Sequence, residues 1–93
     1  MRVVRLVITG RVQGVGYRAW AIEAGRRLGL RGWVRNRADG AVELVAAGAA
    51  ECVAVMVAAC GRGPPAARVA AVEVEDSEDD GSIGFTARPT LGP

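Results

Sequence analysis

Apolar and polar residues alternate along the chain with two different periods, and each period predicts one kind of element. A period of two is typical of strands, and it runs through Val3–Ile8, where Val4, Leu6 and Ile8 share one face. The same period, and short apolar runs between turn residues, predict four more strands. They span Gly32–Asn36, Ala41–Ala47 (Val42, Leu44 and Ala46 on one face), Val69–Glu75 and a short last segment, Gly84–Arg88.

An apolar residue at every third or fourth position predicts two helices, over Ala19–Leu28 and Ala49–Cys60. The residues expected to face the sheet are Ala21, Ala24 and Leu28 in the first helix and Val53, Met56, Val57 and Cys60 in the second. Gly29 is a stop signal after the first helix, and Gly63-Pro64-Pro65 follows the second. Ala38-Asp39-Gly40 is typical of a hairpin turn between the second and third strands.

The predicted order is strand, helix, strand, strand, helix, strand, with the short extra C-terminal strand after it. Two helices on one face of a mainly antiparallel sheet form the ferredoxin-like α/β sandwich, an α+β fold. Ninety-three residues suffice for one such domain, so we expect residues 1–93 to fold as a single unit, with Pro89–Pro93 frayed at its end. The fold hosts many activities and predicts no function by itself.

The net charge of +2 conceals an uneven distribution of charge. Residues 1–72 contain eleven Arg and four acidic residues, whereas residues 73–80 contain six acidic residues and no Arg. The excess of Arg reflects either codon bias alone or a positive field that attracts anions. The acidic segment Asp76–Ser82 is expected to be a solvated turn.

Cys52 and Cys60 are eight residues apart in the second predicted helix, which places them about 12 Å apart along its axis. A disulfide needs Cα atoms within about 7 Å, so we expect both cysteines to be reduced. The chain has no signal-peptide pattern and no apolar run as long as the roughly 18 residues of a membrane span. We therefore expect a cytoplasmic monomer with no membrane partner.

The segment between the first strand and the first helix is the candidate binding site. Gly14 and Gly16 allow its backbone to adopt positive φ and to approach a ligand without a Cβ in the way. The helix that follows presents unpaired N–H groups and the positive end of its dipole to the same point. Arg18 adds a guanidinium that stays protonated at working pH. A small oxyanion such as phosphate fits this combination.

The residue types exclude several kinds of chemistry. The chain contains no His and no Lys, which excludes a phosphate-loop lysine and a Schiff base. No Cys, His or carboxylate cluster has metal-ligand spacing, and we expect neither a metal nor a cofactor. Gly14-x-Gly16-x-x-Ala19 matches the dinucleotide fingerprint, but the chain is too short for the doubly wound sheet that the fingerprint requires.

Two motifs at a fixed interval carry a family resemblance. Gly10-Arg11-Val12-Gln13-Gly14-Val15-Gly16-Tyr17-Arg18 is followed by Gly32-Trp33-Val34-Arg35-Asn36, then by Asp39-Gly40-x-Val42-Glu43 and Gly48. This pattern closely resembles the acylphosphatase family over nearly the whole chain. The resemblance implies hydrolysis of a carboxyl phosphate to a carboxylate and inorganic phosphate, without a cofactor.

The resemblance also implies a role for each site residue. The phosphoryl oxygens would be held by the backbone N–H groups of Gln13, Gly14, Val15, Gly16, Tyr17 and Arg18. The side chain of Arg18 would bind the same group, and Asn36 would hold the attacking water. Tyr17 is expected to pack beneath the loop, and Arg11 to be solvated near the mouth of the site. Trp33 is expected in the core or on a sheet face, where its indole N–H needs a partner if it is buried.

Two other classes of function compete with an enzyme. An anion-binding module could use the same loop without turnover, but it would have no use for a water-holding amide at Asn36. Nucleic-acid binding would use the Arg-rich part of the chain, yet the sequence has no aromatic-rich strand on which bases could stack. We therefore expect an acyl phosphate as substrate, inorganic phosphate as product or inhibitor, and no nucleic-acid partner.

Overall fold

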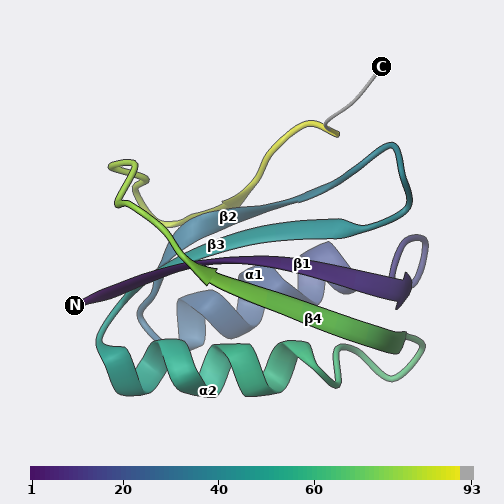
Figure 1. Ribbon diagram of the computed structural model, residues 1–93, viewed down its shortest axis with the longest axis horizontal. Coiled ribbons are helices and arrows are strands. Elements are labelled where there is room, and N and C mark those ends of the chain that lie inside the picture. The colour runs from purple at the N-terminus through teal and green to yellow at the C-terminus, as the bar shows by residue number, and fades with distance from the viewer. Residues whose placement is uncertain (91–93) are drawn as a thin grey trace.

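Seven elements follow one another in the predicted order in the computed structural model, which describes residues 1–90 (Figure 1). They are β1 (Arg2–Arg11), α1 (Tyr17–Arg27), β2 (Arg31–Asn36), β3 (Val42–Gly48), α2 (Ala50–Cys60), β4 (Arg68–Asp76) and β5 (Phe85–Ala87). β1 continues to Arg11 instead of ending at Ile8, because β4 pairs with it as far as Arg68. Of the segment Pro89–Pro93, which we expected to be frayed, residues 91–93 lie outside the described part.

One five-stranded sheet joins the strands in the order β4-β1-β3-β2-β5. β1 pairs with β3 and β4, and β3 pairs with β2, all antiparallel, whereas the short β5 pairs with β2 in parallel. Both helices pack against the same face of this sheet (Figure 1). The predicted ferredoxin-like sandwich, with its extra C-terminal strand, is confirmed.

The apolar core lies between the sheet and the two helices. Its buried residues include, as predicted, Val4, Leu6, Ile8, Val42, Leu44 and Ala46 from the sheet and Ala21, Val53, Met56 and Cys60 from the helices. Val34 of β2 is buried with them. Three residues expected there are only partly buried, namely Ala24, Leu28 and Val57. Phe85 of β5 is fully buried, and its ring fills a notch where a Cβ on Gly25 or Gly32 would lie 2.6 Å or 3.1 Å away. This contact docks β5 onto α1 and β2.

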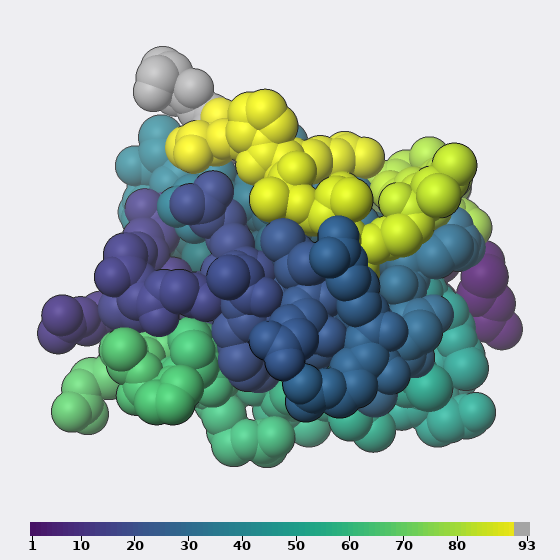
Figure 2. Space-filling view, turned by 180° about the vertical axis from the view of Figure 1, so that it is seen from behind, coloured from purple at the N-terminus to yellow at the C-terminus, as the bar shows by residue number. Residues whose placement is uncertain are grey.

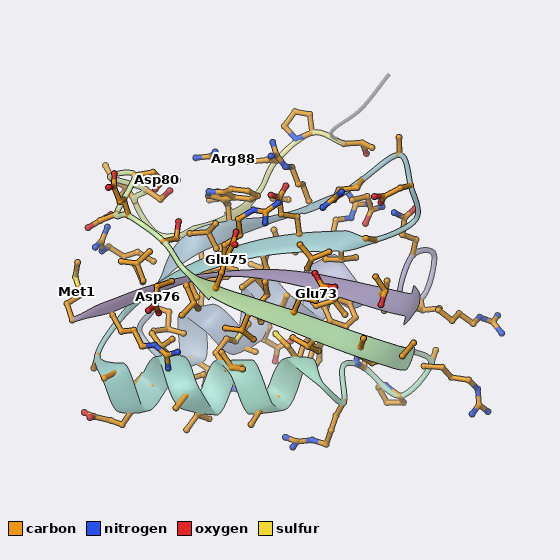
Figure 3. The ribbon with its side chains drawn as sticks, in the orientation of Figure 1. Met1, Glu73, Glu75, Asp76, Asp80 and Arg88 are labelled. Carbon is orange, nitrogen blue, oxygen red and sulfur yellow. The ribbon has the colours of Figure 1, made fainter. Side chains whose placement is uncertain are left out.

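The opposite face of the sheet, here called the polar face, carries a chain of ion pairs beside a small apolar cluster formed by Val3, Trp33, Val45 and Ala47. Glu43 of β3 is 3% exposed and accepts hydrogen bonds from Arg5 Nε at 2.6 Å and Arg35 Nε at 2.7 Å. Burial opposes the charged carboxylate, but the two guanidinium groups outweigh burial and lower the pKa of Glu43. Arg5 also donates to Glu75, which projects from β4 beside Glu73 (Figure 3). These contacts link β4, β1, β3 and β2.

The acidic segment after β4 is exposed, as expected for a solvated turn, but two of its carboxylates are also bound to the sheet. Asp79 pairs with Arg31 at 2.7 Å, and Asp80 accepts a hydrogen bond from the indole N–H of Trp33 at 2.9 Å. Both partners belong to β2, so residues 77–88 form a C-terminal strap along the edge of that strand. The segment is held because the polar sheet face offers a guanidinium and an indole N–H that need acceptors.

Trp33 anchors the strap on the polar face of the sheet. Two guanidinium groups lie over its ring, that of Arg35 at 4.6 Å from the centroid and that of Arg88 at 4.5 Å. Arg88 also lies 3.5 Å from Asp80, and both residues lie on the C-terminal segment in Figure 3. Hydrogen bonds from Ser82 and from Trp33 lower the pKa of Asp80 to about 2. The carboxylate therefore stays charged at neutral pH.

Candidate active site

Residues 12–16 form the loop between β1 and α1, and two glycines set its shape. Gly14 and Gly16 have φ angles of +72° and +80°, in the left-handed region that other residues rarely adopt. Nothing lies within 4 Å of the positions that their Cβ atoms would take, so the loop surface there is open. Gly16 is also the N-cap of α1, and the helix begins at Tyr17 rather than at the predicted Ala19.

The start of α1 leaves several backbone N–H groups without an acceptor. The first hydrogen bond of the helix runs from the N–H of Trp20 to the carbonyl of Gly16, and no side chain caps the helix. Within residues 1–90, none of the N–H groups from Gln13 to Ala19 donates a hydrogen bond. The first turn also contains no acidic residue that would offset the positive end of the helix dipole. This arrangement suits an oxyanion.

The side chain of Gln13 has a position that the sequence did not predict. Its amide nitrogen Nε2 donates to the carbonyl of Arg37 at 2.8 Å and to the carbonyl of Ala41 at 2.9 Å. Both carbonyls belong to the connection between β2 and β3, which begins directly after Asn36. Gln13 therefore ties the loop to the end of the strand that carries Asn36.

Tyr17 packs beneath the loop, as predicted. It is 2% exposed, its hydroxyl donates to the carbonyl of Cys60 at 2.6 Å, and its ring meets Trp20 edge-on at 5.2 Å. Burial raises the pKa of this hydroxyl, which stays neutral. Gly63 makes room for the ring, because a Cβ there would lie 2.7 Å from it. Tyr17 thus joins the start of α1 to the end of α2 and supports the loop from below.

Arg18 and Asn36 line one hollow of about 360 Å³, together with Gly14 and Gly16. Arg18 is the second residue of α1, and Asn36 is the last residue of β2. Among the ion pairs formed within the described residues, none involves Arg18. An anion held at the start of α1 would therefore meet an available guanidinium and have a side-chain amide beside it.

The sequence-predicted residues do not all face this hollow. Gln13 directs its side chain to the hairpin, and Val15 packs against the core, so each can offer a ligand only its backbone. Sequence reasoning missed four apolar lining residues, Val12, Ala19, Ile22 and Ala87. Helical spacing from Arg18 could have indicated Ile22. Ala87 belongs to β5, and no local sequence pattern indicates that β5 contacts α1. In Figure 2 the yellow C-terminal segment lies along the blue segment that contains α1.

Other kinds of site were sought in the described part of the chain. Among residues 1–90, no three His, Cys, Asp or Glu side chains lie close enough together to hold a metal ion. None of the helices in this part is long and apolar enough to cross a membrane. Cys52 and Cys60 are both free, and burial raises the pKa of the Cys60 thiol to about 11.

Known proteins share both the sequence and this architecture. The family model described as acylphosphatase matches residues 4–87. An acylphosphatase of Rhizorhabdus wittichii is 54% identical over 87 residues, which cover 94% of this chain and 88% of that protein. One of Rhodospirillum rubrum is 45% identical over 91 residues, 98% and 100% of the two chains. The crystal structure of acylphosphatase from Bacillus subtilis superimposes with a TM-score of 0.91 at 35% identity, over 95% of this chain and 99% of that one.

Proposed function

The chain belongs to the acylphosphatase family, and from that premise we propose how it hydrolyses the carboxyl-phosphate bond of acyl phosphates to a carboxylate and inorganic phosphate. The phosphoryl group binds at the start of α1, held by the backbone N–H groups of residues 13–18 and by the side chain of Arg18. Asn36 holds the attacking water in line with the bond that breaks. No cofactor takes part.

The leaving group explains why this site needs no general acid. An acyl phosphate is a mixed anhydride whose leaving group is a carboxylate, and its parent acid has a pKa of about 4–5, like Asp or Glu. Such a group departs without being protonated. The absence of His from the whole sequence is therefore compatible with catalysis.

Stabilisation of the transition state falls to the donors of the loop and to Arg18. Phosphoryl transfer passes through a loose transition state with negative charge on the equatorial oxygens, so positioning and electrostatics dominate catalysis. By analogy with oxyanion holes, each well-placed donor contributes about 3–4 kcal/mol. The donors here are held in advance, because Gly16 sets the turn and Tyr17 supports it from below.

Asn36 acts on the water rather than on the phosphate. A neutral amide is too weak a base to take the proton, but its oxygen can accept a hydrogen bond from water and orient it. The two hydrogen bonds of Gln13 hold the strand end with Asn36 at a set distance from the loop. The water and the phosphoryl group are thereby kept in one geometry.

One observation carries this proposal. Gly14, Gly16, Arg18 and Asn36 come from a loop, a helix and a strand, and all of them line the same hollow. A phosphate-binding module without turnover would need only the loop and Arg18. The amide of Asn36 beside them favours a water-directed reaction.

A steady-state assay of three proteins tests the proposal. The unmodified protein should hydrolyse acetyl phosphate in the presence of EDTA. Arg18→Gln should lose about 10³-fold in kcat/KM and also lose inhibition by inorganic phosphate, because it removes charge-assisted donors. Asn36→Ala should lose about 10²-fold in kcat while inorganic phosphate still inhibits it normally.

Arg62→Gln is the matched control, since Arg62 is exposed and follows α2. It should leave both kinetic constants unchanged. Full activity in Asn36→Ala would contradict the water-holding role. Phosphate binding without hydrolysis by the unmodified protein would point instead to the binding module.

We further propose that residues 1–93 act as one domain, as a monomer, in the cytoplasm. Residues from both helices and from β1, β2, β3 and β5 share one core, which supports a single unit. Within residues 1–90, the large exposed apolar side chains lie on different segments of the chain, which supports a monomer: Met1, Val55, Val74 and Ile83. The two free cysteines fit a reducing compartment. Gel filtration at assay concentration checks the oligomeric state.

A further inference from the structure

The hollow that contains Arg18 and Asn36 also has an apolar lining. It is formed by Val12 of the loop, by Ala19 and Ile22 of α1 and by Ala87 of β5. Among the described residues that line the hollow, only Arg18 is charged. The site therefore offers two environments, a polar one for the phosphoryl group and an apolar one next to it.

Helix geometry fixes the relation between these two environments. Ile22 lies four residues after Arg18, so both side chains point to the same side of α1. They are separated by one turn, or about 6 Å along the axis. A phosphoryl group bound at the start of the helix therefore has its substituent directed along α1, over Ile22, or outward into solvent.

The facing wall is held in place by the strap. Ala87 is paired with Val34 on β2, two residues before Asn36, and the next N–H, of Arg88, donates to the carbonyl of Val34 at 2.9 Å. Phe85, two residues earlier on the same face of β5, is fully buried in its notch. The methyl group of Ala87 is thus presented beside Asn36 from a fixed strand.

We propose that Ala19, Ile22 and Ala87 form the subsite for the acyl group, and that it selects acyl phosphates with a compact apolar acyl group, aromatic or branched aliphatic. This inference rests on the proposed function. A volume of about 360 Å³ for the whole hollow is at the lower end of small-molecule sites, which span about 300–1,000 Å³. It has room for a phosphoryl group and a ring, and the rest of a longer chain would extend into solvent. An acyl group with a second negative charge gains no partner at the apolar lining.

Substrate competition between acyl groups tests this subsite. The substrates are acetyl, benzoyl and succinyl phosphate, and the variants are Ile22→Ala, which removes the apolar floor, and Ala87→Leu, which fills the hollow. Relative to the unmodified protein, each variant should lower the ratio of kcat/KM for benzoyl over acetyl phosphate by about five- to tenfold. Inhibition by inorganic phosphate should stay within about twofold, because the phosphoryl end is untouched.

Two matched variants control for general effects of the substitutions. Ile83→Ala removes the same atoms at a position that is 90% exposed, and Ala54→Leu adds the same atoms on the exposed side of α2. Both should leave the substrate ratio unchanged. Thermal unfolding of all four variants checks that each is folded at the assay temperature.

The subsite is wrong if the benzoyl-to-acetyl ratio stays unchanged in Ile22→Ala and Ala87→Leu, or if the unmodified protein prefers succinyl phosphate. These results differ from failure of the proposed function, in which the unmodified protein hydrolyses none of the three substrates. A parallel loss of phosphate inhibition in both variants would also overturn the subsite, because Ile22 and Ala87 would then act on the phosphoryl end.

Discussion

The two helices are equal in length and lie on the same face of the sheet, yet only one of them begins at the hollow. Each spans 11 residues, and neither has a side-chain cap. α1 starts from Gly16, with φ of +80°, and its second residue is Arg18. α2 starts from Ala49, with φ of −58° and ψ of 136°, and its second residue is Glu51.

Under the proposed function, the difference is that the surroundings of a helix N-terminus decide whether it binds an anion. Both helices have free N–H groups in the first turn, and both have a positive dipole end there. In α2, Glu51 complements that dipole, as is usual in stable helices. In α1, a cation stands at the same position and opposes the dipole, so the site is built at some expense of helix stability. In the proposed complex, a bound phosphate would offset this repulsion.

Exchanging the charges at the second helical position should separate activity from stability most strongly. Arg18→Glu should lower kcat/KM by more than about 10³-fold, since it repels the phosphate. It should also raise the free energy of unfolding by about 0.5 kcal/mol, because a carboxylate complements the dipole. Urea unfolding and acetyl phosphate hydrolysis measure the two effects. Glu51→Arg in α2 should lower the free energy of unfolding by a similar amount and leave activity unchanged. A loss of stability in Arg18→Glu would contradict the electrostatic comparison of the two helices.

A substitution in the turn that leads into α1 should have the second-largest effect on activity. Gly16→Ala forces a Cβ into a left-handed conformation and should cost about 1–2 kcal/mol of stability or shift the loop, with a loss of about 10²-fold in kcat/KM. Gly29→Ala is the matched control, because Gly29 has φ of +69°, open space around its Cβ position and no place in the hollow. It should lose similar stability and keep its activity. Equal activity loss in both variants would show that strain alone is responsible.

Loss of the hydrogen bonds between Gln13 and the β2–β3 connection should reduce activity less. Gln13→Leu removes two hydrogen bonds and lets the end of β2 drift relative to the loop. We expect kcat to fall about tenfold while inhibition by inorganic phosphate changes little, because the loop donors remain. A weaker phosphate inhibition with unchanged kcat would assign Gln13 to phosphate binding alone.

The smallest expected effect is on stability alone and concerns α2, the helix that does not begin at the hollow. Ala49→Ser places a capping hydroxyl at an N-cap that lacks one and should stabilise the protein by about 1 kcal/mol. Hydrolysis of acyl phosphates should be unaffected. Thermal unfolding with a parallel activity assay checks both, and any change in kcat would mean that α2 is coupled to the site.

Local patterns in the sequence predicted the elements and several residues that line the hollow. Alternation predicted which face of β1 and β3 meets the helices, and Gly14, Gly16 and Arg18 stood together in one stretch next to a helix start. The family resemblance was needed to single out Asn36, because an Asn before a turn has an ordinary structural explanation.

The missed features all depend on contacts between residues far apart in the chain. Phe85 is buried because Gly25 and Gly32 leave room for its ring. Neither glycine stands in a sequence pattern that predicts an aromatic contact. The strap docks because Asp79 and Asp80 find donors on β2. A run of acidic residues looks the same in a sequence whether or not such donors exist.

The two kinds of ion pair on the polar sheet face respond differently to ionic strength. Glu43 is almost completely shielded from water, so dissolved salt has little access to its bonds with Arg5 and Arg35. The strap pairs, Asp79 with Arg31 and Asp80 with Arg88, are about one-third exposed or more and weaken as salt rises. At high salt the acidic residues of the strap would therefore loosen first, whereas β5 stays docked because Phe85 is fully buried. Under the proposed subsite, Ala87 would keep its place, and the preference among acyl groups would not change with ionic strength.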